Sequence, residues 1–237
     1  AGNYACESGD TDGTGVTTQA TGTCACPAGK YTGSVGQTSC TDCESGKYQG
    51  STGTTECTNV LKGDYACLSG DDDGAGETSA ATASCDCPAG KYTASDGQTS
   101  CTDCEEGKYQ GSTGTTVCTA AQQGYFASIS DTAATSAATG ETQVAAGSYA
   151  CDSDEGTPDG VGVTTLASGQ CACPAGKYTA SAGQTSCTAC EEGKYQEITG
   201  QATCSAAQQG YFASISDTAT TSAATGETQV AAGSYAC

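Results

Sequence analysis

The cysteines are the residues of this 237-residue chain best suited to chemistry, because two neighbouring thiols oxidise to a disulfide. Eighteen of the nineteen form three sets of six. The first set, Cys6 to Cys57, has 17, 1, 13, 2 and 13 residues between successive cysteines, and the second, Cys67 to Cys118, repeats these spacings. The third, Cys151 to Cys204, differs only in a first loop of nineteen residues. Such regular spacing predicts disulfides and an oxidising, extracellular setting.

The expected disulfide cysteines are Cys6, Cys24, Cys26, Cys40, Cys43, Cys57, Cys67, Cys85, Cys87, Cys101, Cys104, Cys118, Cys151, Cys171, Cys173, Cys187, Cys190 and Cys204. Six cysteines allow about fifteen pairings. The repeated loop pattern favours Cys6–Cys24, Cys26–Cys40 and Cys43–Cys57, in which each loop closes on itself. Each closure is expected to stabilise the fold by about 3 kcal/mol. The main alternative crosses the middle bonds, as Cys24–Cys40 and Cys26–Cys43.

Two other kinds of chemistry are disfavoured. A zinc centre is the competing interpretation of so many cysteines, but the chain has no His and no two Cys-x2-Cys pairs at finger-like spacing. Without His or Arg, and with the cysteines oxidised, a Ser or Thr nucleophile has no evident base. We therefore expect no catalytic residue and no enzymatic activity.

Acidic residues gather in the first loop of every set, interleaved with Gly. Carboxylates on a Gly-rich turn can wrap a calcium ion with side-chain and carbonyl oxygens. Their spacings differ between the loops, however, and none matches an EF-hand. The alternative is a solvated acidic turn that keeps the protein soluble. The candidate calcium ligands are Asp10, Asp12, Asp71, Asp72, Asp73, Asp152, Asp154 and Asp159.

Composition excludes several partners. The formal net charge is −20 and every basic residue is Lys, so nucleic-acid binding is not expected. No apolar run is long enough to cross a membrane, and no signal peptide is visible. Neither Asn3 nor Asn59 begins an N-glycosylation sequon. The Ser/Thr-rich runs 112–116 and 132–142 are candidates for O-linked glycans.

The elements that position these residues must be small, because the chain has no Trp, no Met and two Phe with which to build a core. The loop pattern Cys-x-x-Gly-x-Tyr…Gly-x-Thr-x-Cys predicts a hairpin. Its first strand begins at Gly-x-Tyr and its second is the returning Gln-Thr-Ser-Cys. We expect the regularly spaced tyrosine rings to pack on neighbouring disulfides rather than to form a ligand groove.

The same pattern continues through segments without cysteine. Val60 and Val144 stand where an opening cysteine is expected, and Ala121 begins a loop that we expect Val144 to close. In that loop the opening and closing cysteines are lost together, which favours loops that close on themselves. The loop contains Phe126 in a short run, YFASIS, that predicts a strand. It recurs with one substitution at 206–237.

The double loops at 26–57, 87–118 and 173–204 carry Cys-x-x-Gly-x-Tyr…Gly-x-x-x-Cys twice, separated by two residues. This pattern resembles the cysteine-rich repeat of ephrin-receptor-like and tumour-necrosis-factor-receptor-like ectodomains, which also occurs in long surface proteins of protists. The resemblance implies an elongated, disulfide-laddered rod outside the cell, without enzymatic activity. Family members include receptors, adhesins and structural coats, so the resemblance says more about fold than about function.

We expect a small disulfide-rich all-β protein, built as a tandem array of short hairpin loops that forms a rod with little or no helix. The chain starts and stops at the same phase of the repeat, so we expect a window of a longer array. Cys237 is then the first cysteine of a further module, or a free or intermolecular thiol. The expected domains are cysteine-rich modules at 1–57, 58–118 and 149–204, cysteine-free β inserts at 119–148 and 205–234, and the start of a further module at 235–237.

Nearly identical repeats favour a structural role. The leading hypothesis is a building block of an extracellular fibre, appendage or surface coat that assembles with other copies of itself through repeated surfaces. The alternative is the stalk or ectodomain of a cell-surface receptor or adhesin. The first hypothesis predicts self-association, and the second predicts monomers that carry a separate binding head.

Overall fold

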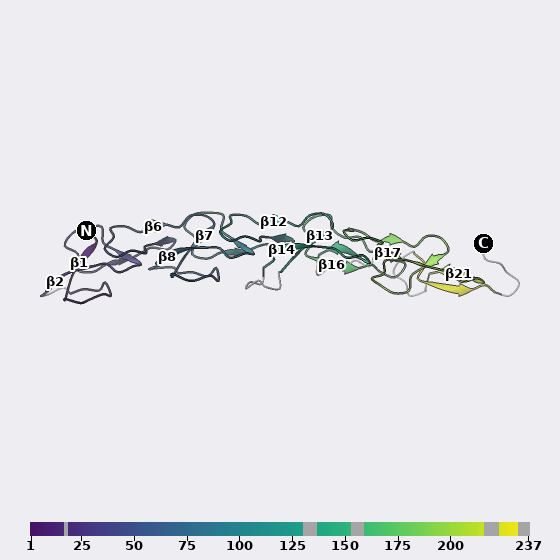
Figure 1. Cartoon of the computed structure of the whole chain (residues 1–237), viewed down its shortest axis with the longest axis horizontal. Coiled ribbons are helices and arrows are strands. Elements are labelled where there is room, and N and C mark those ends of the chain that lie inside the picture. Colours follow the sequence, from purple (N-terminus) through teal and green to yellow (C-terminus); the bar gives the residue numbers. More distant parts are fainter. Residues whose placement is uncertain (17–18, 130–136, 153–158, 216–222, 232–237) are drawn as a thin grey trace. The chain divides into compact units, whose positions relative to one another are not determined.

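A computed structural model describes all residues except 17–18, 130–136, 153–158, 216–222 and 232–237. The described residues contain no helix. Their 22 strands pair two by two into antiparallel hairpins that follow one another along the chain (Figure 1). The prediction of a small disulfide-rich all-β array of hairpins is therefore confirmed.

Five hairpins have strands of four residues. They are β1 (Asn3–Cys6) with β2 (Gly22–Ala25), β7 (Asp64–Cys67) with β8 (Ala83–Asp86), β13 (Tyr125–Ser128) with β14 (Gly140–Gln143), β15 (Ser148–Cys151) with β16 (Gly169–Ala172), and β21 (Tyr211–Ser214) with β22 (Gly226–Gln229). The predicted YFASIS strand is thus present as β13 and, in its copy, as β21.

The other hairpins have strands of two residues. They are β3 (Lys30–Tyr31) with β4 (Thr41–Asp42), β5 (Lys47–Tyr48) with β6 (Thr58–Asn59), β9 (Lys91–Tyr92) with β10 (Thr102–Asp103), β11 (Lys108–Tyr109) with β12 (Thr119–Ala120), β17 (Lys177–Tyr178) with β18 (Thr188–Ala189), and β19 (Lys194–Tyr195) with β20 (Ser205–Ala206).

The register of these short hairpins corrects the predicted return strand. Lys30 pairs with Asp42 and Tyr31 with Thr41, so the partner strand follows the closing cysteine instead of preceding it. The reason is the disulfide, which holds Cys40 beside Cys26. The residues just after Cys40 consequently run alongside Lys30 and Tyr31, and the Gln-Thr-Ser-Cys segment forms the turn.

Nine disulfides close the loops, each joining the two cysteines of one loop, and the crossed alternative does not occur in the described residues. Their Cα–Cα distances of 5.7 to 6.0 Å suit an unstrained bridge. Cys237 lies outside the described residues. The bridges are Cys6–Cys24, Cys26–Cys40, Cys43–Cys57, Cys67–Cys85, Cys87–Cys101, Cys104–Cys118, Cys151–Cys171, Cys173–Cys187 and Cys190–Cys204.

The chain divides into two compact units. The first comprises Ala1–Cys104, Gln110–Cys118 and 131–137, and it contains hairpins β1–β2 to β9–β10. The second comprises Glu105–Tyr109, Thr119–Ser130 and Ala138–Cys237, and it contains hairpins β11–β12 to β21–β22.

Within each unit, successive loops are joined by one repeated backbone hydrogen bond. The N–H of the residue that opens a loop donates to the carbonyl of the Gly in the preceding Gly-x-Tyr step. In the first unit Cys26 N donates to Gly2 O, and in the second Val144 N donates to Gly124 O, both at 3.0 Å. Valine makes the same bond as cysteine, because the bond needs only the main chain.

The Gly of this step also seats the turn of the next loop but one. Gly46 has φ of +75°, and a Cβ placed on it would overlap the carbonyl of Gly97. Gly97 N in turn donates to Val60 O at 2.8 Å. Only glycine combines this backbone angle with so close an approach, which explains why the step repeats without substitution.

Candidate functional site: the acidic first loop

A buried tyrosine lies under the first loop of every cysteine-rich module. The ring of Tyr4 is 1% exposed and packs with Cys6 and Cys26 and, at the edge, with Cys24 and Cys40. Tyr65 and Tyr149 form the same cluster with the first two disulfides of their modules. The predicted packing of tyrosine on disulfides therefore holds at these three positions, whereas the tyrosines of the Gly-Lys-Tyr steps are only half-buried.

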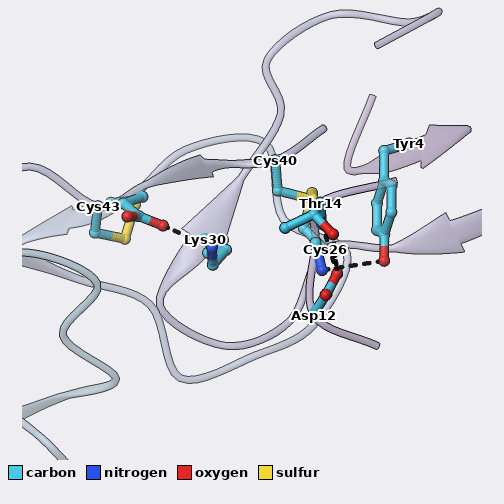
Figure 2. A network of polar contacts seen from close by, with 10 residues as sticks. Tyr4, Asp12, Thr14, Cys26, Lys30, Cys40 and Cys43 are labelled. Atoms are coloured by element: carbon cyan, nitrogen blue, oxygen red, sulfur yellow. Dashed lines mark hydrogen bonds and ion pairs between the residues drawn. A yellow bond between two sulfur atoms is a disulfide. The ribbon is translucent and has the colours of Figure 1, made fainter. Parts of the chain in front are cut away.

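The hydroxyl of this tyrosine is held by the loop above it. Gly13 N donates to Tyr4 Oη at 3.1 Å, and the Tyr4 hydroxyl donates to the Asp10 carbonyl at 3.4 Å (Figure 2). In the second module Gly74 N donates to Tyr65 Oη at 3.2 Å. Burial raises the pKa of the Tyr4 hydroxyl and of the Tyr65 hydroxyl. Each hydroxyl therefore keeps its proton and serves as a structural hydrogen-bonding group.

The aspartate just before that glycine folds the turn. Asp12 Oδ1 accepts from Thr14 Oγ1 at 2.6 Å and from Thr14 N at 2.7 Å (Figure 2). These hydrogen bonds hold the pKa of Asp12 below its ordinary value. Asp73 accepts from Ala75 N at 2.8 Å and Asp159 from Val161 N at 3.0 Å. A carboxylate that bonds the amide two residues on is a turn-forming acceptor.

The sequence analysis grouped these acidic residues by abundance and missed the motif that contains them, Asp-Gly-x-Gly. It occurs at 12–15, 73–76 and 159–162, and each copy begins twelve positions before the cysteine that closes its loop. A Cβ on the second Gly of the first copy, Gly15, would overlap the carbonyl of Ala5 and the ring of Tyr4. The motif therefore folds the loop down onto the tyrosine. The two extra residues of the third module precede it.

The candidate calcium ligands do not converge. Asp10 Oδ1 accepts from Asp12 N at 3.2 Å, and Asp71 Oδ2 accepts from Leu68 N at 3.0 Å. Asp72 is exposed, Asp152 is half-buried and Asp154 lies outside the described residues. Among the residues that the structure describes, no three acidic side chains lie close enough together to hold a metal ion. Calcium binding stays a prediction, and the hydrogen-bonded carboxylates serve as acceptors within their own loops.

A shallow cleft of about 230 Å³ lies in the second unit beside the Gly-Lys-Tyr steps. Tyr178, Glu191 and Lys194 are among its lining residues. Lys194 Nζ lies 2.7 Å from Glu191 Oε2, so the cation already has a counter-charge. A cleft of this size is smaller than the usual small-molecule site.

The cysteine-free loop is closed by side chains in a way that the sequence analysis misassigned. It took Val144 as the closing residue, but Val144 N bonds to Gly124 O and so opens the next loop. Glu141 occupies the closing position, because its neighbour Thr142 pairs with Phe126 as Thr58 pairs with Tyr48. Its carboxylate accepts from Gln122 N at 2.8 Å and from Gln122 Nε2 at 2.9 Å. The copy uses Gln208 and Glu227 identically.

These features define a cysteine-rich repeat protein, and nine disulfides suit an oxidising environment. No protein-family model matches the chain, and a search of curated proteins finds no match. Among the described residues, we find no helix that is long and apolar enough to span a bilayer.

One acidic pair offers a pH-dependent test of the repeat. Asp64 lies opposite Asp86 on the hairpin β7–β8, and Ser84 Oγ donates to Asp64 Oδ2 at 3.0 Å. Burial, followed by the Asp86 charge, raises the pKa of Asp64. An acid with a raised pKa favours folding most when protonated, so this contribution is lost as the pH rises through the pKa of Asp64.

The substitution Asp64→Asn, which installs the residue found at the equivalent Asn3, is expected to stabilise the first unit at pH 7 by about 0.5 kcal/mol. The gain should vanish near pH 3, where Asp64 is protonated in the wild type. Melting temperatures at the two pH values measure it, with Asp72→Asn as the exposed control. A gain of equal size at both pH values would contradict the charge explanation.

Proposed function

We propose that this chain is a structural building block of an extracellular fibre, appendage or surface coat, and that it assembles with copies of itself through repeated surfaces. Its likeness to ephrin-receptor-like and tumour-necrosis-factor-receptor-like repeats supports an extracellular location. The net charge of −20 argues against nucleic acid as a partner.

One observation carries the proposal: the connection between loops does not depend on what fills them. The bond from a loop-opening residue to the preceding Gly carbonyl has the same form in cysteine loops and in the cysteine-free loop. A disulfide joins Cys43 to Cys57, whereas Gln122 and Glu141 close the corresponding cysteine-free loop through hydrogen bonds. A repeat that bonds each neighbour through the main chain can be extended indefinitely, as a structural protein requires.

Surface chemistry supports the same role. Apart from the shallow cleft described above, the candidate sites are turns whose carboxylates bind their own loop. The exposed Ser112 and Thr113 are suited to O-linked glycans, which would cover the surface of such an array. The run 132–142 begins among residues outside the described part.

The alternative is a stalk of a cell-surface receptor or adhesin. The same resemblance favours it, because receptors and adhesins are built from similar repeats. It requires monomers and a separate binding head. Recognition surfaces are commonly rich in aromatic residues and Arg, and this chain has two Phe, no Trp and no Arg.

Electron microscopy of native, unreduced material tests the two roles. The structural role predicts long fibres or ordered sheets whose repeat equals one or a few modules. Separate particles without ordered contacts between copies would contradict the structural role and favour the stalk. Thiol alkylation followed by mass measurement is the control, because reduced cysteines would contradict both roles.

A further inference from the structure

The cysteine-free hairpin β13–β14 is covered by the hairpin that follows it, β15–β16, within the second unit. Phe126 packs against a cluster whose three central members, Val144, Ala150 and Ala167, are at most 1% exposed, and Val163 lies at its edge. Ala127 N donates to the Ala167 carbonyl at 2.9 Å, which joins the two hairpins through the main chain.

Two glycine seats complete the same junction. Gly107 and Gly124 lie so close to the carbonyls of Leu166 and Gly183, respectively, that neither has room for a Cβ. Gly183 N also donates to the Val144 carbonyl at 2.8 Å. The junction thus consists of an apolar cluster, an edge hydrogen bond and two seated turns.

The copy of the hairpin, β21–β22, has the same residues without this cover. Phe212, the equivalent of Phe126, is 46% exposed, and Val230 is half-buried where Val144 is fully buried. A Cβ on Gly193 or on Gly210 would meet nothing within 4 Å. No acceptor for Ala213 N is found among the described residues. We call Gly193, Gly210, Phe212, Ala213 and Val230 the tail face.

The first hairpin of the chain carries the complementary surface. Val16 N donates to Ala5 O at 3.2 Å as Val163 N donates to Ala150 O at 3.0 Å, so the two loops correspond residue by residue. Ala5 is half-buried and Ala20 is exposed, whereas their equivalents Ala150 and Ala167 are 1% exposed.

The turns of this surface match as well. Gln19 has φ of 57°, close to the 63° of the seated Leu166, and Gly36 has φ of +76°, close to the +78° of the seated Gly183. A Cβ on Gly36 would meet nothing within 4 Å. We call Ala5, Val16, Gln19, Ala20 and Gly36 the head face.

One position distinguishes this head face from a generic module. The second module has Glu77 where the first has Val16 and the third has Val163, and all three residues make the same backbone bond. The second module follows a hairpin with Tyr48 at the contact, and the third follows a hairpin with Phe126. Valine thus accompanies phenylalanine, and the head face carries the valine that suits Phe212.

We propose that the tail face of one copy binds the head face of a second copy, so that chains join end to end in one direction. The seats at Gly193 and Gly210 receive the turns at Gln19 and Gly36, and the Ala20 carbonyl accepts from Ala213 N. Because the two faces differ, the contact is heterologous and builds open filaments. The proposal rests on the self-assembly of the proposed function and assigns the surfaces. It uses none of residues 232–237.

The test uses the full chain with its disulfides intact, in sedimentation velocity over a range of concentrations. The wild type is expected to form a ladder of linear oligomers. Val16→Glu blocks the head with a residue that this loop accepts in the second module, and Phe212→Thr blocks the tail while retaining a strand former. Each is expected to raise the dissociation constant at least about tenfold.

A mixture of the two variants provides the sharpest outcome. Each variant keeps one working face, so the mixture should form a single species of twice the 23.1 kDa chain mass and nothing larger. The control is Val117→Glu, which places a charge on a valine that is 65% exposed and that corresponds to Glu56 in the first module. It should assemble like the wild type.

The outcomes separate this proposal from the proposed function. A monomeric wild type, oligomers that both variants still form, or a mixture that grows beyond dimers would overturn the end-to-end contact. Native fibres together with unaffected variants would refute the contact and leave the structural role intact. End-to-end oligomers of the purified chain, with only separate particles in native material, would support the contact and refute the structural role.

Discussion

Gly46→Ala is expected to destabilise the first unit by about 4 kcal/mol. A positive φ at alanine costs about 1–2 kcal/mol. The new Cβ would also overlap the Gly97 carbonyl, and relief of such overpacking costs about 1–3 kcal/mol more. Denaturation in guanidinium with intact disulfides measures the loss. Hydrogen exchange locates it at the amides of Val60 and Gly97, whose bonds of 3.0 and 2.8 Å join the loops.

Gly97→Ala is the matched control, because it concerns the other partner of the same contact. Gly97 has φ of +74°, close to the +75° of Gly46, but a Cβ there meets nothing within 4 Å. The equivalent turn position holds Ala80 and Leu166 at positive φ in other loops. The control should therefore lose only about 1–2 kcal/mol. Equal losses in the two variants would contradict the close approach as the reason for glycine.

Replacing both Cys87 and Cys101 by serine is expected to destabilise the first unit by about 4–5 kcal/mol. Loss of the cross-link accounts for about 3 kcal/mol in the chain-entropy model. A further 1–2 kcal/mol, roughly, comes from placing serine hydroxyls against the buried Tyr65 ring. Equilibrium unfolding measures the total. Exchange of the Gly74 amide, which donates to Tyr65 Oη, reports the loss of the tyrosine cluster.

Replacing Cys104 and Cys118 by serine is the control for the entropy term. That bridge has the same sequence separation of 14, and both of its cysteines are half-exposed. Its loss should cost about 3 kcal/mol and leave the Gly74 amide protected. If both double variants lost equal stability, the packing of tyrosine on disulfides would contribute nothing beyond the cross-link.

Cysteine spacing predicted the pairing of the loops because a short loop leaves few partners within reach of a thiol. The same spacing predicted the hairpin array and the strand at Tyr125–Ser128. The register of the short hairpins was not predictable in this way. It depends on where the closed bridge Cys26–Cys40 places the next residues, and the two-residue strands are too short to carry an alternating pattern.

The candidate site shows the same division. The sequence located the acidic loops but could not say whether Asp12 faces a metal or the Thr14 amide, since both uses suit a carboxylate beside glycine. It also placed loop closure at Val144, because hydrogen bonding of Glu141 to Gln122 has no fixed spacing to recognise.

By itself the sequence determined the disulfide-linked loops and their all-β character, because cross-links between near neighbours are local. Only the tertiary structure decided which glycines seat a neighbouring turn and which tyrosines are buried. It also decided that Phe126 is covered where Phe212 is 46% exposed, although the two lie in nearly identical segments. Contact with the loop after next, and not local sequence, makes that difference.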